Sequence, residues 1–140
     1  MTELTDIRVL IVDANAHIRR LIATLLGALS IKDVHEARNP AAAVPLMVEN
    51  PPHLIITDLA ADATETVLFV HRIRRGELVD ARTPVLALAG STHHAVLEQA
   101  RAAGIDDVIA KPISAIEVIQ RASDLLHAGL RRDAALQPTG

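Results

Sequence analysis

The sequence predicts a doubly wound α/β fold, with a five-stranded parallel sheet in the strand order 2-1-3-4-5 and helices on both faces. Short, nearly continuous apolar runs alternate with segments of helical periodicity along the chain. Strands buried on both faces have this continuous apolar character. The length of 140 residues fits one domain. Half of the residues are hydrophobic and a single phenylalanine is the sole aromatic, so the expected core consists of Ala, Val, Ile and Leu.

The expected elements follow from these runs and periodicities. The strands are expected at residues 7–13, 34–37, 54–58, 84–89 and 108–111, and the helices at 18–29, 40–50, 64–75, 95–103 and from 115 onward. The first helix rests on apolar residues that recur every three or four positions from Ile18 to Leu29. This alternation of strand and helix is the pattern of a parallel sheet covered on both faces.

Capping residues mark the ends of the second and fourth helices. Asn39 is a preferred N-cap residue, and Pro40 suits the first helical position. Pro45 lies inside the same helix, where it is expected to kink or loosen it. Residues 91–92 (Ser-Thr) can cap the fourth helix, and Gly104 is placed to end it.

The last helix is expected to begin after Ser114, which can cap it. Its core face is expected to carry four apolar residues, namely Ile116, Ile119, Ala122 and Leu126. From Arg131 to Gly140 the sequence has no core-facing pattern. We therefore expect a frayed tail at this end of the chain.

Three of the predicted strands end on a charged residue: Asp13, Asp58 and Lys111. In open α/β sheets, ligands bind at the carboxyl ends of the strands. The strand order places the first and third strands side by side, so we expect the carboxylates of Asp13 and Asp58 to be neighbours within reach of Lys111. Two carboxylates and one ammonium, with a formal charge of −1, suit a metal ion and a phosphoryl group.

Composition excludes several other functions. The absence of cysteine rules out disulfides and thiolate metal sites, and the net charge of −3 disfavours a nucleic-acid surface. The N-terminal residues lack the basic and apolar regions of a signal peptide. No apolar stretch approaches the roughly 20 residues that a membrane-spanning helix needs. We therefore expect a cytoplasmic protein that binds neither membranes nor nucleic acid.

Several motifs, in the same order and spacing, resemble those of response-regulator receiver domains of two-component signalling. They are residues 9–13 with Arg19, 53–58, 83–85 and 103–112. The resemblance covers residues 7–128 and implies a flavodoxin-like (βα)5 receiver domain over 1–128. Residues 129–140 are then a C-terminal tail, either disordered or an extension of the last helix.

The resemblance also implies roles for the strand-end residues. Asp58 would accept a phosphoryl group from a histidine kinase or phosphotransferase, and Lys111 would pair with that group. Asp13, Asp58 and the backbone carbonyl of Ala60 would hold Mg²⁺. Asn15 lies two residues after Asp13, but its residue type and its position favour capping of the first helix.

The sequence departs from the family pattern at three site positions. Ala14 stands where the family has a second acidic residue, Ala89 where it has threonine or serine, and Val108 where it has an aromatic residue. The loop at 60–66 also differs from the usual one. We expect weaker Mg²⁺ binding, because hard cations owe their affinity to oxygen ligands, and an altered conformational switch.

Two functions remain open at this point. The first is a stand-alone, atypical receiver that accepts a phosphoryl group on Asp58 and signals through contacts with a downstream protein. The alternative is a phosphorylation-independent pseudo-receiver that docks on a kinase or an output protein. The last two helices and the fifth strand would carry either contact, and could also support a homodimer. An enzyme is not expected, because the chain has no glycine-rich phosphate loop and no nucleophile elbow.

Overall fold

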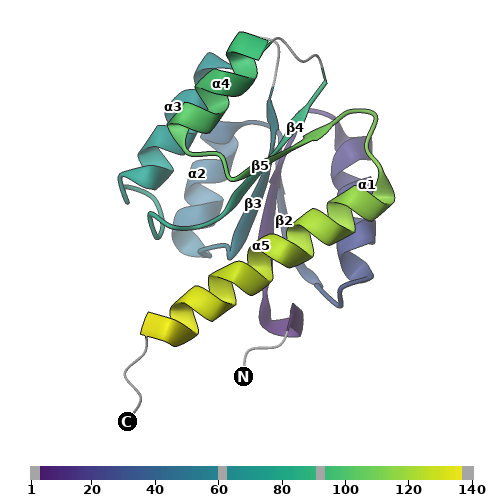
Figure 1. The fold of residues 1–140 in the computed structure, drawn as a ribbon. Coiled ribbons are helices and arrows are strands. Elements are labelled where there is room, and N and C mark those ends of the chain that lie inside the picture. Colours follow the sequence, from purple (N-terminus) through teal and green to yellow (C-terminus); the bar gives the residue numbers. More distant parts are fainter. Residues whose placement is uncertain (1–3, 60–62, 91–93, 137–140) are drawn as a thin grey trace.

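The computed structural model of the chain describes residues 4–59, 63–90 and 94–136, and its centre is a single parallel sheet (Figure 1). The strands are β1 (Arg8–Val12), β2 (Asp33–Ala37), β3 (Leu54–Leu59), β4 (Val85–Ala89) and β5 (Asp107–Ala110). Their order in the sheet is β2-β1-β3-β4-β5, and every adjacent pair is parallel. The predicted fold class and strand order are confirmed.

Helices cover both faces of the sheet. In chain order they are the short 3₁₀ helix η1 (Leu4–Asp6), α1 (Ala16–Gly27), α2 (Pro40–Glu49), α3 (Thr64–Arg74), α4 (His94–Ala103) and α5 (Ala115–Leu136). Helices α1 and α5 pack on one face, and α2, α3 and α4 on the other (Figure 1). Each face has its own buried apolar cluster, and alternate residues of β1 and β3 contribute to the two clusters.

The first two helices begin at the predicted caps. The Asn15 side chain accepts hydrogen bonds from the backbone N–H groups of His17 and Ile18, and the Asn39 side chain accepts one from Ala42. Helix α2 runs through Pro45 to Glu49, so the proline lies inside the helix as expected. The buried side chains of Ala43 and Met47 lie on either side of this proline, and their packing holds the helix against the sheet.

Helix α4 ends where glycine was expected to end it. Gly104 has a φ of 115°, a conformation that residues with a Cβ rarely adopt. A Cβ added there would lie 2.8 Å from the side chain of Arg74. The guanidinium of Arg74 donates hydrogen bonds to the carbonyl oxygens of Gly104, Ala81 and Thr83, and so connects α3 to the segments around β4. The predicted cap at residues 91–92 lies outside the described residues.

The core face of α5 differs from the prediction. Ile116 was assigned to it but is 75% exposed, and Val118 is buried in its place, together with Ala122 and Leu126. Two positions correspond to about 200° of rotation around a helix, so Ile116 and Val118 point to opposite sides. The expected cap is present, since the Ser114 hydroxyl oxygen accepts a 3.4 Å hydrogen bond from the backbone of Glu117.

The C-terminal part of α5 is also more regular than expected. The helix continues to Leu136, so residues 131–136, which were expected to be frayed, are helical. Leu130 packs against the same apolar cluster as α1, so the helix contacts the domain at least as far as this residue. Among the described residues, no helix is both long enough and apolar enough to cross a membrane.

Candidate functional site

The sheet brings the three predicted strand-end residues to one edge. Val12 of β1 lies beside Thr57 of β3, so Asp13 and Asp58 stand next to each other at the carboxyl ends of neighbouring strands. Lys111 follows β5, and its backbone N–H donates a 2.8 Å hydrogen bond to the carbonyl oxygen of Ala89 in β4. The two acidic residues and the lysine therefore meet at the C-terminal edge of the sheet, the usual ligand-binding edge of this architecture.

Lys111 contacts both carboxylates directly. Its Nζ lies 2.7 Å from Oδ1 of Asp58 and 3.4 Å from Oδ2 of Asp13. Burial lowers the pKa of Lys111, but the hydrogen bonds and negative charges of Asp58 and Asp13 outweigh it and raise the pKa above the ordinary 10.5. The lysine is therefore protonated at neutral pH, and the three groups carry a formal charge of −1.

Asp13 is fixed by groups from two neighbouring elements. Its carboxylate accepts a 2.8 Å hydrogen bond from the backbone N–H of Asn15, and its own N–H donates to the carbonyl oxygen of Ala37. Arg19 donates to the backbone carbonyl oxygen of Asp13 at 2.6 Å and to Oε1 of Glu36 at 2.9 Å. Arg19 belongs to one of the sequence motifs that resemble the family. Only the structure shows that its side chain connects α1 to β2 and to Asp13.

Asp58 is held differently, through its backbone. Its carbonyl oxygen accepts hydrogen bonds from the hydroxyls of Thr57 (3.3 Å) and Thr66 (3.2 Å). The buried Thr66 belongs to the first turn of α3, and it was not predicted as part of the site. The Asp58 side chain is 27% exposed, whereas that of Asp13 is 3% exposed. Asp58 is therefore the carboxylate that an incoming group can reach.

The three departures from the family pattern surround this cluster. Ala14 is exposed beside Asp13, and Ala89 is buried at the end of β4, next to Ala110 of β5. Val108 is half-buried in β5. Their aliphatic side chains offer neither a metal ligand nor a hydrogen-bond donor. The backbone carbonyl of Ala60, predicted as a Mg²⁺ ligand, lies outside the described residues.

The two carboxylates are enough, together with phosphate and water, to suit a magnesium ion. Mg²⁺ is commonly bound by one or two carboxylates together with phosphate oxygens and water, and Asp13 and Asp58 supply two carboxylates. Within residues 4–59, 63–90 and 94–136, no group of three or more His, Asp or Glu side chains is arranged to hold a metal. A Mg²⁺ ion held by these two carboxylates would take its remaining oxygen ligands from groups other than the described side chains, such as phosphate and water.

Comparison with known proteins identifies the family. The family model described as response regulator receiver domain matches residues 9–123. The chain is 34% identical to a protein-glutamate methylesterase/protein-glutamine glutaminase of Anaeromyxobacter dehalogenans, with 94% of this chain and 39% of that protein covered. It is 32% identical to the transcriptional regulatory protein ResD of Bacillus subtilis, with 91% and 51% covered. The chain thus spans about half, or less, of the length of these relatives.

Solved structures agree on the fold. The receiver domain of the Francisella response regulator 1452 superposes with a TM-score of 0.75 at 24% identity, covering 88% of this chain and 98% of that one. The receiver domain of NtrX from Brucella abortus gives a TM-score of 0.75 at 22% identity, covering 85% and 98%. With the family match over most of its length and acidic strand ends paired to a lysine, the chain belongs to the response regulator receiver domains of two-component signalling.

Proposed function

We propose that Asp58 is the phosphoryl acceptor of this receiver domain. The observation that carries the proposal is the difference in exposure between the two carboxylates, since Asp58 is 27% exposed and in contact with Lys111 while Asp13 is 3% exposed. A nucleophile has to approach phosphorus directly, and a buried carboxylate held by Asn15 cannot do so. Asp13 therefore contributes charge and position, and Asp58 reacts.

The reaction is an exchange of one bond for another at phosphorus. A carboxylate oxygen of Asp58 attacks the phosphorus of a phosphohistidine on a histidine kinase or phosphotransferase. The phosphorus–nitrogen bond breaks as the phosphorus–oxygen bond forms, and the imidazole nitrogen keeps the electron pair and takes a proton from solvent. Lys111, which is already hydrogen-bonded to Asp58, neutralises charge on the transferred oxygens.

Charge balance supports phosphorylation but favours a requirement for metal. An acyl phosphate in place of the Asp58 carboxylate raises the negative charge of the cluster by about one unit, to about −2. Asp13 and Asp58 would hold Mg²⁺, which when bound neutralises phosphoryl oxygens. Because Ala14 supplies no third carboxylate, we expect phosphorylation to require a higher Mg²⁺ concentration than in a receiver that has all three acidic residues.

The response to phosphorylation is expected to differ from the usual one. A hydroxyl at the end of β4 can bond to a phosphoryl oxygen and draw its loop inward, but Ala89 offers only a methyl group. Val108 also lacks the alternative positions of a large aromatic ring. We assign the output contact, with a downstream protein or a second copy, to the surface of α4, β5 and α5.

Intact mass measurement tests the acceptor. The protein is incubated with a small-molecule phosphodonor, with and without Mg²⁺, beside Asp58→Asn and the matched variant Asp13→Asn. We expect a gain of one phosphoryl group that depends on Mg²⁺, is absent in Asp58→Asn and is slower in Asp13→Asn. A full gain in Asp58→Asn would contradict the assignment of the acceptor.

A second function is favoured by the side chains at the switch positions. Ala89 and Val108 together remove the two groups that couple phosphorylation to movement, so docking on a kinase or output protein without phosphate is the alternative. Comparison of backbone amide NMR shifts before and after phosphorylation separates the two functions. Changes that spread to α4 and β5 support a phosphorylation-driven switch, whereas unchanged spectra or no mass gain at high Mg²⁺ support the docking module.

A further inference from the structure

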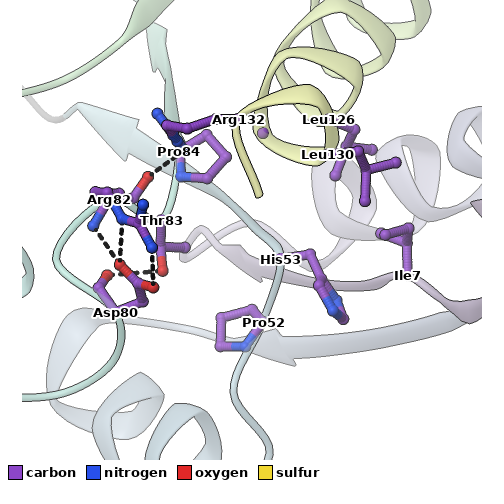
Figure 2. A pocket seen from close by; sticks show the side chains of 11 residues that line it. Ile7, Pro52, His53, Asp80, Arg82, Thr83, Pro84, Leu126, Leu130 and Arg132 are labelled. Carbon is purple, nitrogen blue, oxygen red and sulfur yellow. Dashed lines mark hydrogen bonds and ion pairs between the residues drawn. The ribbon is translucent and has the colours of Figure 1, made fainter. Parts of the chain in front are cut away.

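The opposite edge of the sheet, where the strands begin, contains a pocket that the phosphoryl-acceptor site does not use (Figure 2). Eleven residues line it, and they come from the segments before β1, β3 and β4 and from the second half of α5. Its apolar wall consists of Ile7, Pro52, Pro84, Leu126 and Leu130. Figure 2 shows Ile7, Leu126 and Leu130 on one side of the pocket and Asp80 and Arg82 on the other, with Pro84 beside Arg82.

Charge at this pocket is positive, unlike the chain as a whole. Asp80 pairs with Arg82, with 3.2 Å between Oδ2 and Nη2. Hydrogen bonds from the side chain and backbone of Arg82 hold the pKa of Asp80 below its ordinary 3.8, so this carboxylate is ionised. Arg132 adds a second guanidinium, whose Nη2 donates a 3.2 Å hydrogen bond to the uncharged backbone carbonyl of Arg82. Among the described residues that line the pocket, two arginines and one aspartate leave an excess of one positive charge.

The size of the pocket indicates what it can hold. Its volume is about 120 Å³. Sites for small molecules and cofactors are usually larger, about 300–1,000 Å³. An apolar cavity of roughly 150 Å³ is known to accept a molecule the size of benzene. The pocket is therefore of the right size for one aliphatic side chain, the kind of anchor that protein partners insert at the centre of an interface.

A glycine within α5, Gly129, lines the pocket and bears independently on its role. At this helical position, glycine lowers stability relative to alanine. Its backbone does not adopt a positive φ, and a Cβ added there would meet only the Nη2 of Arg132, at 3.9 Å, among the described atoms. The described part of the fold gives no reason for a glycine at this position. The absence of a side chain does, however, keep the pocket open.

We propose that this pocket docks a segment of a partner protein that carries an aliphatic side chain next to a carboxylate. The aliphatic group enters between Leu126, Leu130 and Pro84, and the carboxylate meets the guanidinium of Arg132. This contact is independent of the proposed phosphorylation, because Asp58 lies at the other edge of the sheet.

An NMR titration tests the proposal. The probe is an amidated eight-residue peptide with one leucine between two glutamates, added to the ¹⁵N-labelled protein at millimolar concentration. We expect saturable shifts of the amides of Thr83, Gly129 and Leu130, and no shift at Gly27. A peptide with both glutamates changed to glutamine should bind roughly threefold more weakly, the size of one exposed ion pair. The absence of saturable shifts at these three amides would overturn the proposal.

Matched variants locate the binding. Gly129→Leu should abolish the shifts, because its side chain occupies the pocket, whereas Gly27→Leu, at another glycine with open space around it, should leave them unchanged. Arg132→Gln should weaken binding to the same degree as the glutamine peptide, and Arg131→Gln should not. The variant Asp58→Asn should bind the peptide normally, which keeps this test separate from that of the acceptor. Concentration-dependent shifts of the same amides without peptide would instead assign the pocket to a second copy of the chain and overturn the assignment to a partner protein.

Discussion

The two edges of the sheet are built from opposite kinds of side chain. At the carboxyl ends of the strands, the ammonium of Lys111 lies 3.4 Å from the carboxylate of Asp13 and 2.7 Å from that of Asp58, and charge dominates. At the amino ends, apolar side chains such as Leu126 line an open pocket, to which the Asp80–Arg82 ion pair also contributes. The first edge is therefore suited to chemistry on a charged group, and the second to the shape of a partner. The following substitutions are expected to affect the two edges in different ways.

The largest effect is expected at the apolar edge. Leu126→Ala removes a side chain that is buried between α5 and the sheet and enlarges the neighbouring pocket. We expect a loss of about 3 kcal/mol in the free energy of unfolding, measured by urea denaturation followed by far-UV circular dichroism. The half-buried Leu125 serves as a control, and Leu125→Ala should cost less. Equal losses in the two variants would contradict the described packing of α5.

The charged edge should respond to the loss of the ammonium that contacts both carboxylates. Lys111→Met leaves the carboxylates of Asp13 and Asp58 facing each other without the ammonium between them. We expect a loss of about 2 kcal/mol at low salt, because a partly buried acid loses its charged hydrogen-bond partner. Added salt should reduce this loss but not that of Leu126→Ala. The exposed Lys32 provides the control, and Lys32→Met should leave stability unchanged within measurement.

Gly129→Ala should stabilise the protein. Glycine inside a helix costs roughly 0.5–1 kcal/mol relative to alanine, and the added methyl group at this position meets no close neighbour. Thermal unfolding measures the gain. Gly104→Ala is the contrasting change, since the positive φ and the Arg74 side chain at 2.8 Å predict a loss there. A loss of stability in Gly129→Ala would show that the pocket wall is tighter than described.

The smallest effect is expected from alkaline pH. The pKa of Lys111 is raised above 10.5 in the folded protein, so its contribution to stability is complete below pH 10.5 and is lost as pH rises through the folded-state pKa. The chain has no tyrosine or cysteine, which leaves few other side chains to titrate in that range. The stability difference between the wild type and Lys111→Met should therefore shrink above pH 10.5. A difference that stays constant would contradict the Lys111–Asp58 contact.

The two edges of the sheet also differ in how much of them could be predicted from the sequence. Asp13, Asp58 and Lys111 could be assigned to one site because each ends an apolar run, and strand order alone then brings them together. Thr66 could not be assigned, since its hydrogen bond to the Asp58 backbone depends on how α3 starts. Ile116 was placed in the core because the helical phase of α5 depends on the residue at which the helix begins.

The pocket at the opposite edge had no signal in the sequence. Its lining residues come from segments separated by dozens of positions, and their types are those of ordinary core and surface residues. The helix through Pro45 was expected, but the packing of Ala43 and Met47 that holds it against the sheet on both sides of the proline is seen only in the structure. Residues that end recognisable apolar runs could be assigned to the site, whereas contacts that depend on the exact start of a helix or on how side chains of distant segments pack could not.

The single phenylalanine has a consequence for spectroscopy. Phe69 is 3% exposed and belongs to the cluster beneath α2, α3 and α4, and the chain contains no tryptophan or tyrosine. Its phenyl ring current acts only on nearby methyl groups, so strongly upfield-shifted methyl resonances should come from this face of the sheet. The methyl groups beneath α1 and α5 lack such a ring. A one-dimensional proton spectrum can thus follow melting of one side of the protein separately from the other.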